Sequence, residues 1–386
     1  MAKELPFLKL GSRQARVLAG HPWVFGNELA AAPDPALDGL AAELLDARGR
    51  SLGSGIVNSR SQIVWRRYSR ERRAFDEAFL HEALRAALDR RNEDPVQRLA
   101  WSEADRMPGL VVDRYGDVLC VQALTLAVDQ RLEAITRLLR ELLPGIREVV
   151  YRNDAPTREK EGLPRETRTD SGERLAPFWQ EIDGVRYELD LQHAHKTGFY
   201  LDQRAQQRKV GSLAQGRRVL DAFCNAGAFG LQAALRGADE VLAIDSVEDC
   251  IRQTHRNAVE NKLPIAAESA NVFDWFRANP SERFDLIVLD PPSFAPNRKA
   301  LDGALRGYKE LNLRALKALN IGGILATYSC SQAVTAEIFR GAVRDAATDA
   351  RCDVRVLEEV TQPADHPEVL TFPESAYLHG LILAKD

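Results

Sequence analysis

Cysteine is scarce and scattered in this chain of 386 residues. The cysteines are Cys120, Cys224, Cys250, Cys330 and Cys352. Their number is odd and no two form a Cys-x-x-Cys pair, so neither a disulfide framework nor a cysteine zinc site is indicated. This usage predicts a protein of the reducing cytoplasm. Histidine is sparse too: His193 and His195 lack a third ligand nearby, and we expect no metal site.

Long apolar runs and an excess of one charge are also lacking. No apolar stretch approaches the roughly 18 residues of a membrane span, and Met1–Pro6 lacks the apolar core of a signal peptide. We therefore expect no membrane association. The net charge is −4, so this is not a polycation that holds nucleic acid by bulk charge. Binding to RNA would need a local basic patch.

Two apolar runs that end in polar residues are the most informative features present. The run 286–289 ends at Asp290 before two prolines, and the run 324–328 leads to Cys330 between two serines. Each run is typical of a buried parallel strand. Ligands bind at the carboxyl ends of such strands, so we expect Asp290 and Cys330 to share one crevice. An acid beside a potential thiolate suggests covalent catalysis on a flat, polar substrate.

A strand–turn–helix–strand pattern over residues 218–245 predicts a nucleoside cofactor. The first strand ends at Asp221, the turn contains Gly227 and Gly230, and the second strand ends at Asp245. Asp245 stands near the offset of about 20 residues that is typical of a ribose-binding acid. The third glycine that a dinucleotide pyrophosphate requires is missing, which disfavours NAD. S-adenosylmethionine, which has no phosphate, fits the pattern.

The order of predicted elements indicates an α/β protein of three domains. Residues 1–70 contain short strands and turns typical of a small barrel, and a helix is expected over 76–91. Strands at 109–114, 118–124 and 148–152 with a helix at 129–143 predict an α+β middle domain over 71–180, in which 154–173 reads as a loop or hairpin. From residue 181 to 386 strands and helices alternate, which predicts a doubly wound, Rossmann-like sheet. The first helix of that sheet is expected over 231–236.

Three motifs resemble the bacterial 23S ribosomal RNA methyltransferases that form 5-methylcytosine. They are Asp-Pro-Pro-Ser-Phe at 290–294, Ser-Cys-Ser at 329–331 and the segment 193–204, which contains Lys-Thr-Gly-Phe-Tyr-Leu-Asp-Gln-Arg. Residues 20–25 look like the opening of that family's PUA domain, and 107–115 look like its middle domain. The resemblance implies a class I methyltransferase domain, S-adenosylmethionine as cofactor and 23S ribosomal RNA as partner.

These signals together give a set of candidate site residues. Cys330 is expected to act as the nucleophile that adds to carbon 6 of cytosine, and Asp290 to hold the amino edge of the base. The predicted cofactor contacts are Tyr200, Gln203, Arg204, Asp221, Phe223, Asn225, Gly227, Asp245, Ser246, Asn271, Val272 and Asp290. The carbonyl of Asn271 is expected to accept from the adenine amino group. Many RNA 5-methylcytosine enzymes carry a second cysteine in the Asp-Pro-Pro motif; here Ser293 stands there, so the base and the release group stay open.

The RNA contacts predicted from sequence are Lys196, Arg66 and Arg67. The two arginines belong to an arginine cluster that also includes two aromatic residues, a pattern that suits RNA but also suits an ordinary solvated surface. Its members are Arg60, Arg66, Arg67, Arg70, Arg72 and Arg73, with Trp65 and Tyr68. Two other functions remain open. One is N-methylation of adenine or guanine, which uses an Asp-Pro-Pro tip and needs no thiol. The other is a non-catalytic RNA-binding factor of ribosome assembly. Oligomeric state is not predicted.

Overall fold

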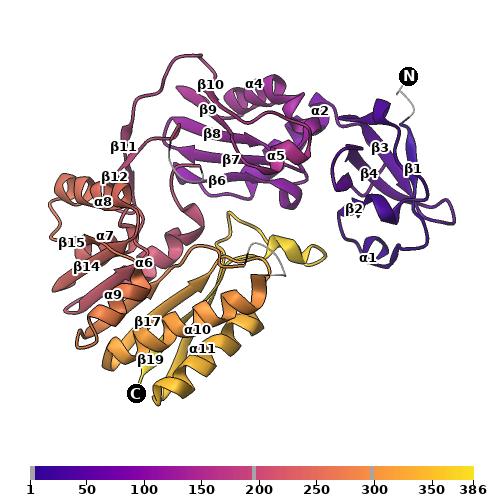
Figure 1. Ribbon diagram of the computed structural model, residues 1–386. Coiled ribbons are helices and arrows are strands. Elements are labelled where there is room, and N and C mark those ends of the chain that lie inside the picture. Colours follow the sequence, from indigo (N-terminus) through magenta and orange to yellow (C-terminus); the bar gives the residue numbers. More distant parts are fainter. Residues whose placement is uncertain (1–4, 194–196, 296–299) are drawn as a thin grey trace. The chain divides into compact units, whose positions relative to one another are not determined.

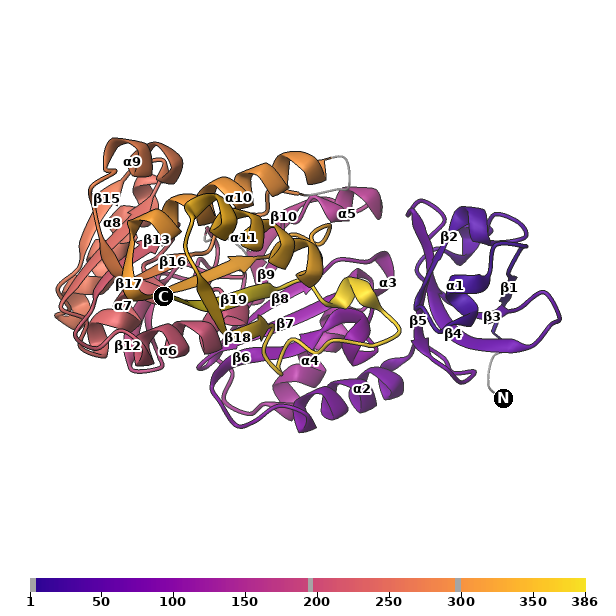
Figure 2. The same cartoon turned by 90° about the horizontal axis from the view of Figure 1, so that it is seen from below.

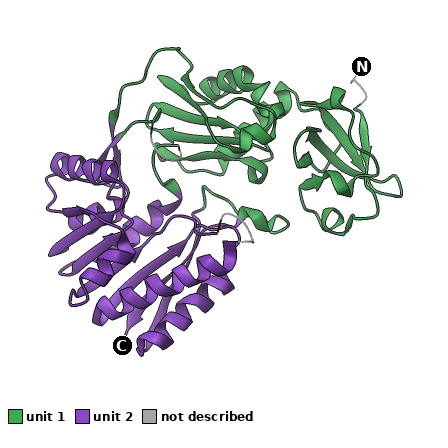
Figure 3. Ribbon diagram, in the orientation of Figure 1, with its two compact units in different colours: residues 1–178, 189–201, 364–375 green, residues 179–188, 202–363, 376–386 purple. Residues whose placement is uncertain are grey.

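The computed structural model describes residues 5–193, 197–295 and 300–386. The chain divides into two compact units (Figure 3). Unit 1 comprises residues 1–178, 189–201 and 364–375, and unit 2 comprises 179–188, 202–363 and 376–386. Lys196, one of the predicted RNA contacts, lies outside the described residues.

Unit 1 begins with a small five-stranded sheet whose strand order is β1-β3-β4-β5-β2. The strands are β1 (Phe7–Lys9), β2 (Trp23–Phe25), β3 (Ala41–Leu45), β4 (Ser51–Val57) and β5 (Ile63–Ser69), with a short helix α1 (Ala15–Leu18). The fully buried Trp65 is at its centre and donates from its indole nitrogen to the carbonyl of Ala42 at 3.0 Å. A side chain at Gly55 would collide with the Trp65 ring, which explains a glycine in the middle of a strand.

The second part of unit 1 is a five-stranded sheet of order β10-β9-β8-β7-β6. Its strands are β6 (Val96–Trp101), β7 (Leu110–Tyr115), β8 (Val118–Ala123), β9 (Glu148–Asn153) and β10 (Glu166–Thr169). Helices α2 (Glu77–Asp89) and α4 (Leu132–Leu142) contribute to its core. Asp76 begins α2 by accepting from the N–H of Phe79 at 2.9 Å, which is an N-cap.

Two expectations for this part differ from the structure. The helix expected over 129–143 corresponds to α4, which begins at Leu132; Asp129 belongs to a separate short helix, α3 (Leu126–Asp129), because the chain leaves helical geometry at Arg131 (φ −112°, ψ 10°). Within the expected loop or hairpin 154–173, residues Thr157–Lys160 form α5, and β10 pairs antiparallel with β9 rather than with a strand of its own segment. Polar composition concealed β10, because it is an edge strand with few buried side chains.

Unit 2 contains a seven-stranded sheet of order β15-β14-β13-β16-β17-β19-β18 (Figure 1). The strands are β13 (Arg218–Ala222), β14 (Glu240–Asp245), β15 (Ala266–Ser269), β16 (Phe284–Leu289), β17 (Leu319–Ser329), β18 (Val354–Thr361) and β19 (His379–Lys385). The first five run parallel, and β19 is antiparallel to both of its neighbours. The predicted Rossmann-like class is therefore confirmed, with an antiparallel strand near one edge. A hairpin of β11 (Phe178–Ile182) and β12 (Val185–Leu189) precedes the sheet.

Helices cover both faces of this sheet. Those on one face are α6 (Arg204–Ser212), α7 (Ala228–Leu235) and α8 (Glu248–Asn261); those on the other are α9 (Val272–Ala278), α10 (Leu301–Ala318) and α11 (Ala336–Ala350). Helices α10 and α11 lie side by side (Figures 1 and 2). Helix α7 begins at Ala228, earlier than expected from sequence, because Gly227 with φ 78° ends the preceding loop and serves as its N-cap. In the described part of the chain, no helix is long and apolar enough to span a bilayer.

Candidate active site

Asp290 and Cys330 follow two neighbouring strands. Strands β16 and β17 pair in parallel, with Leu289 opposite Thr327. Asp290 comes directly after β16 and Cys330 directly after β17. Both side chains are half-buried, and the Cys330 sulfur lies 4.0 Å from the carbonyl oxygen of Pro291. The adjacency of these strand ends that the sequence predicted is confirmed.

The carboxylate of Asp290 is held by a residue from the start of α6. Gln203 donates from its side-chain nitrogen to Oδ1 of Asp290 at 2.9 Å. The Gln203 side chain is almost fully buried, and its Oε1 has no hydrogen-bond partner among the described residues. Gln203 therefore presents one carbonyl acceptor that a donor from a ligand would satisfy.

The loop after β13 has an unusual backbone. Phe223, Asn225 and Gly227 have φ values of 67°, 49° and 78°, and two non-glycine residues in this region signal a constrained loop. The Asn225 carbonyl accepts from Thr254 at 3.1 Å, and the Ala226 carbonyl accepts from the Asn257 side chain at 3.0 Å. Helix α8 thus holds the loop, while Asn225 donates its backbone N–H to Asp245 at 3.0 Å.

Asp245 and Asp221 have different surroundings at the ends of adjacent strands. Asp245 is half-buried, and its two oxygens accept from the backbone N–H groups of Asn225 and Val247 at 3.0 Å each. Asp221 is fully buried. Burial, and to a lesser extent the charges of Asp290 and Asp245, raise the pKa of Asp221 to about 7, although the hydrogen bond from Gly230 opposes them.

The carboxylates of Asp221, Asp245 and Asp290 therefore gather where β13, β14 and β16 end, with the orphan carbonyl of Gln203 beside Asp290. Oδ1 of Asp221 also lacks a partner in the part of the chain that the structure describes. A cationic ligand with N–H donors would satisfy these acceptors and relieve the repulsion among the acids. S-adenosylmethionine, with its ammonium and sulfonium groups, has this chemistry, so the residues present fit it.

The predicted adenine contacts lie at the start of α9. Asn271 is the N-cap of that helix, and its Oδ1 already accepts from the N–H groups of Phe273 and Asp274 at 3.0 and 3.3 Å. The expected acceptance from adenine is therefore disfavoured, because capping uses this carbonyl; the Asn271 side-chain nitrogen is the group left for a ligand. Val272 is buried as the first residue of α9, and Ser246 is exposed after β14.

Comparisons with known proteins agree with this geometry. The family model for S-adenosylmethionine-dependent methyltransferases matches residues 110–382, and a PUA-like domain model matches residues 11–70. Ribosomal RNA large subunit methyltransferase I from Tolumonas auensis is 37% identical over 96% of this chain and 97% of its own. The protein of that name from Escherichia coli K12 is 35% identical over 95% and 96%.

The chain belongs to the ribosomal RNA large subunit methyltransferase I family of S-adenosylmethionine-dependent methyltransferases. Its cofactor is S-adenosylmethionine. A solved structure described as a SAM-dependent methyltransferase from Streptococcus mutans shares the fold over 99% of this chain and all of that one, with a TM-score of 0.83 and 19% identity. A second solved structure, of a methyltransferase complexed with SAH, has a TM-score of 0.85 and 20% identity over the same shares.

The described residues of the segment 193–204 form hydrogen bonds and an ion pair with other residues of the unit to which each belongs. In unit 1 of the methyltransferase, Thr197 donates to the buried Asp113, and the N–H of Phe199 donates to the Tyr115 hydroxyl at 3.1 Å. In unit 2, Arg204 forms a two-pronged ion pair with Asp183 at 2.7 and 2.8 Å. Contacts of Tyr200 and Arg204 with the cofactor stay predictions; the pairing of Arg204 with the β11–β12 turn had no signal in the sequence.

Arg66 and Arg67 are engaged inside the methyltransferase. Arg66 pairs with Glu103 at 3.0 Å and with Glu161 at 3.3 Å, and only 15% of its side chain is exposed. Arg67 donates to the carbonyl of Gly20, and burial lowers its pKa to about 10. These contacts give both arginines a structural role, because the terminal nitrogens of Arg66 and one of those of Arg67 already bind partners in unit 1. Sequence reasoning missed this, since the acids that pair with Arg66 are distant in the chain.

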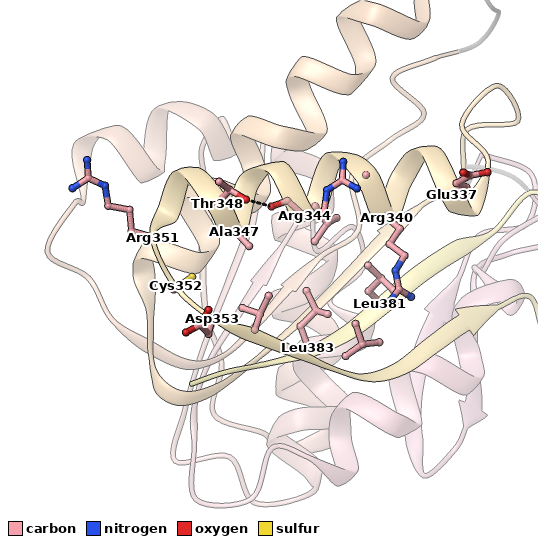
Figure 4. Close-up of a pocket in the computed structure, with 14 residues that line it drawn as sticks. Glu337, Arg340, Arg344, Ala347, Thr348, Arg351, Cys352, Asp353, Leu381 and Leu383 are labelled. Atoms are coloured by element: carbon pink, nitrogen blue, oxygen red, sulfur yellow. Dashed lines mark hydrogen bonds between the residues drawn. The ribbon is translucent and has the colours of Figure 1, made fainter.

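A hollow lies between α11 and the strands β18 and β19 of the methyltransferase (Figure 4). Its volume is about 630 Å³, and it is lined by arginines of α11 such as Arg340 and Arg344 and by apolar residues such as Leu381 and Leu383. Neither Cys330 nor the three acids line it, so it is separate from the candidate active site. No group of three potential metal ligands occurs among residues 5–193, 197–295 and 300–386. His193 instead faces Asp190 at 3.0 Å.

Proposed function

We propose that this methyltransferase methylates carbon 5 of a cytosine in large-subunit ribosomal RNA through a covalent adduct with Cys330. The observation that carries the proposal is the placement of Cys330 and Asp290 at the ends of β17 and β16, next to the acids expected to hold the cofactor. The relatives at 35–37% identity are named ribosomal RNA large subunit methyltransferase I, which supports ribosomal RNA as the substrate.

The chemistry explains why a thiol is needed. Carbon 5 of cytosine is a weak nucleophile, and S-adenosylmethionine supplies an electrophilic methyl group. Addition of the Cys330 thiolate to carbon 6 would form a C–S bond and make carbon 5 enamine-like. Carbon 5 would then bond to the methyl carbon as the methyl–sulfonium bond breaks, with S-adenosylhomocysteine as the leaving group. Loss of the carbon 5 proton and breakage of the C–S bond then restore the aromatic base and the thiolate.

Asp290 is proposed to hold the amino edge of the base and its protonated ring nitrogen during addition. A fixed carboxylate accelerates a reaction most when it stabilises positive charge that develops on the substrate only in the transition state. Gln203 keeps this carboxylate in place through its 2.9 Å hydrogen bond. Asp245 is proposed to accept from the ribose hydroxyls, and the acids of β13 and β16 to attract the cationic end of the cofactor.

The domains are proposed to divide the work. Residues 1–70 would bind RNA, 71–180 would connect, and 181–386 would carry the transfer. The match of a PUA-like model to residues 11–70 supports an RNA-binding role for the first. Since Arg66 and Arg67 are engaged internally and the exposed Arg72 pairs with Glu43 at 3.6 Å, the exposed Arg60 and Arg70 are the better phosphate ligands of the arginine cluster.

Trapping with 5-fluorocytosine tests the chemistry. Fluorine cannot leave carbon 5 as a proton does, so RNA containing 5-fluorocytosine should capture the wild-type enzyme and cofactor in an adduct that survives a denaturing gel. Cys330→Ala should form no adduct and have no turnover, yet bind S-adenosylmethionine normally. Cys352→Ala, a half-buried cysteine that lines the separate hollow, is the matched control and should behave as wild type.

Two other outcomes would redirect the proposal. Turnover without Cys330 would favour N-methylation of adenine or guanine, since the Asp-Pro-Pro tip serves that reaction as well and needs no thiol. Normal cofactor affinity without methyl transfer to any ribosomal RNA would favour a non-catalytic role in ribosome assembly. Mass mapping of the modified RNA distinguishes carbon 5 from nitrogen methylation.

A further inference from the structure

Cys330 stands between two serines that are fully buried. Ser329 and Ser331 have no exposed surface, whereas Cys330 is half-buried. Both serine hydroxyls lie within hydrogen-bond distance of one oxygen, that of Tyr308, so the two serines face the same side. The Ser-Cys-Ser sequence therefore anchors the end of β17 through its two serines and holds the half-buried Cys330 between them.

The anchor is the hydroxyl of Tyr308 in α10. Ser329 donates to the Tyr308 oxygen at 2.9 Å, and the Tyr308 and Ser331 oxygens are 3.0 Å apart. The Ser331 oxygen is also 3.0 Å from that of Ser293, in the loop after Asp290. One chain of hydroxyl groups thus joins the end of β17, the middle of α10 and the loop that follows β16.

Ser329 donates its hydroxyl proton to the Tyr308 oxygen. Each hydroxyl carries one proton, and in the contacts of Ser331 with Tyr308 and with Ser293 either oxygen can be the donor. The network ends at Ser293, which is exposed. Burial raises the pKa of Tyr308, which keeps its hydroxyl a donor across the physiological pH range.

The Tyr308 ring is itself fixed. It packs against Phe294 with ring centres 5.0 Å apart and against Phe339 at 5.3 Å. Phe294 follows Ser293 in the loop, so the same loop contacts both the ring and the hydroxyl network. Removal of the Tyr308 oxygen alone would leave this packing intact and release only the hydrogen bonds.

We propose that Tyr308 is a positioning residue, which fixes Cys330 against Asp290 for attack on the base. The inference rests on the proposed function, since it assigns Cys330 as the nucleophile. Tyr308 itself forms and breaks no bond with the substrate. A displacement of about 1 Å in a reacting group can reduce a rate about 100-fold, and the three hydroxyl contacts limit such displacement at both strand ends.

The test is the rate of adduct formation with 5-fluorocytosine RNA in single-turnover conditions, with saturating RNA and cofactor. Tyr308→Phe should reduce that rate by about 10- to 100-fold, with cofactor affinity and the KM for RNA nearly unchanged. Ser331→Ala should have the same effect, and the double variant should be no slower than either single one. Tyr328→Phe is the matched control: Tyr328 is a buried tyrosine of β17 whose hydroxyl has no partner in the described chain, so its rate should equal that of wild type.

The outcomes separate this inference from the proposed function. If wild type forms no adduct, the cytosine mechanism fails, and the role of Tyr308 in it fails too. If wild type and Tyr308→Phe form adduct at equal rates, only the positioning inference is overturned. Should Tyr308→Phe fail to fold by circular dichroism, Ser293→Ala at the exposed end of the network replaces it and should slow the adduct rate several-fold; an unchanged rate would overturn the inference.

Discussion

Asp221 accepts a hydrogen bond from the backbone N–H of Gly230 at 2.8 Å through one carboxylate oxygen, and the other oxygen has no partner among the described residues. A side chain at Gly230 would lie 3.2 Å from that same carboxylate, so the glycine permits the close approach of α7 to β13. The sequence predicts that this acid contacts the cofactor, and the structure shows that it is fully buried.

Asp221 should make stability fall as pH rises. Its pKa is raised from 3.8 to about 7 in the folded state, so unfolding releases a proton between these values. The contribution of Asp221 to the free energy of unfolding is therefore greatest below about pH 4 and decreases as the pH rises to about 7. At pH 8 the free energy of unfolding of Asp221→Asn should exceed that of wild type by a few kcal/mol, since each pKa unit corresponds to about 1.4 kcal/mol. At pH 4 the two proteins should be equally stable. Urea unfolding at both pH values measures this; equal stabilities at pH 8 would contradict it.

Asp245 should be needed for cofactor affinity. Asp245→Asn keeps the size of the side chain but removes the charged carboxylate, which is proposed to accept hydrogen bonds from the ribose hydroxyls. Affinity for S-adenosylmethionine should fall by about 1.5–3 kcal/mol, the range for hydrogen bonds to charged groups, in calorimetry. Asp285→Asn is the matched control, because Asp285 lies at the opposite end of β16 and binds Arg218 and Asn320; its affinity should be unchanged. Unchanged affinity in Asp245→Asn would refute the ribose assignment.

Arg66 should be required for the stability of unit 1. Burial raises the pKa of Glu103, but Arg66 and hydrogen bonds from Ser102 and Trp23 outweigh it and hold that pKa below its ordinary value. Arg66→Met would leave two buried carboxylates without their cation, which costs about 3–5 kcal/mol. Thermal unfolding of the variant should show this loss. The exposed Arg60→Met serves as control and should be close to neutral; comparable losses in both would count against a special role for Arg66.

RNA binding should depend on the exposed arginines of the cluster. Arg60→Glu and Arg70→Glu should each lower RNA affinity and reduce the slope of log affinity against log salt by about one for each phosphate that the protein no longer neutralises. Both side chains are exposed, so folding should be unaffected. Filter binding between low and moderate salt gives the slope. Slopes that match wild type in both variants would mean that the cluster is an ordinary charged surface.

The sequence alone determined the strands and acids of the catalytic unit. The apolar runs that end at Asp290 and Cys330 are the two neighbouring strands expected, because continuous burial forces a continuous apolar sequence. The turn with Gly227 and the second acid at Asp245 appeared where the pattern indicated. Such features are local: spacing within a few tens of residues fixes them.

Tertiary structure alone decided what these side chains contact. Gln203 meets Asp290, Tyr308 meets Ser329 and Ser331, and Arg66 meets Glu161 across long stretches of chain. The segment expected to be a loop or hairpin contains β10, since its pairing partner is a strand outside that segment. Sequence spacing cannot foresee such contacts, because they depend on which elements the packing of the core brings together. A surface pattern of arginines and aromatics looks the same whether its charges face water or buried acids, and only the fold distinguishes the two.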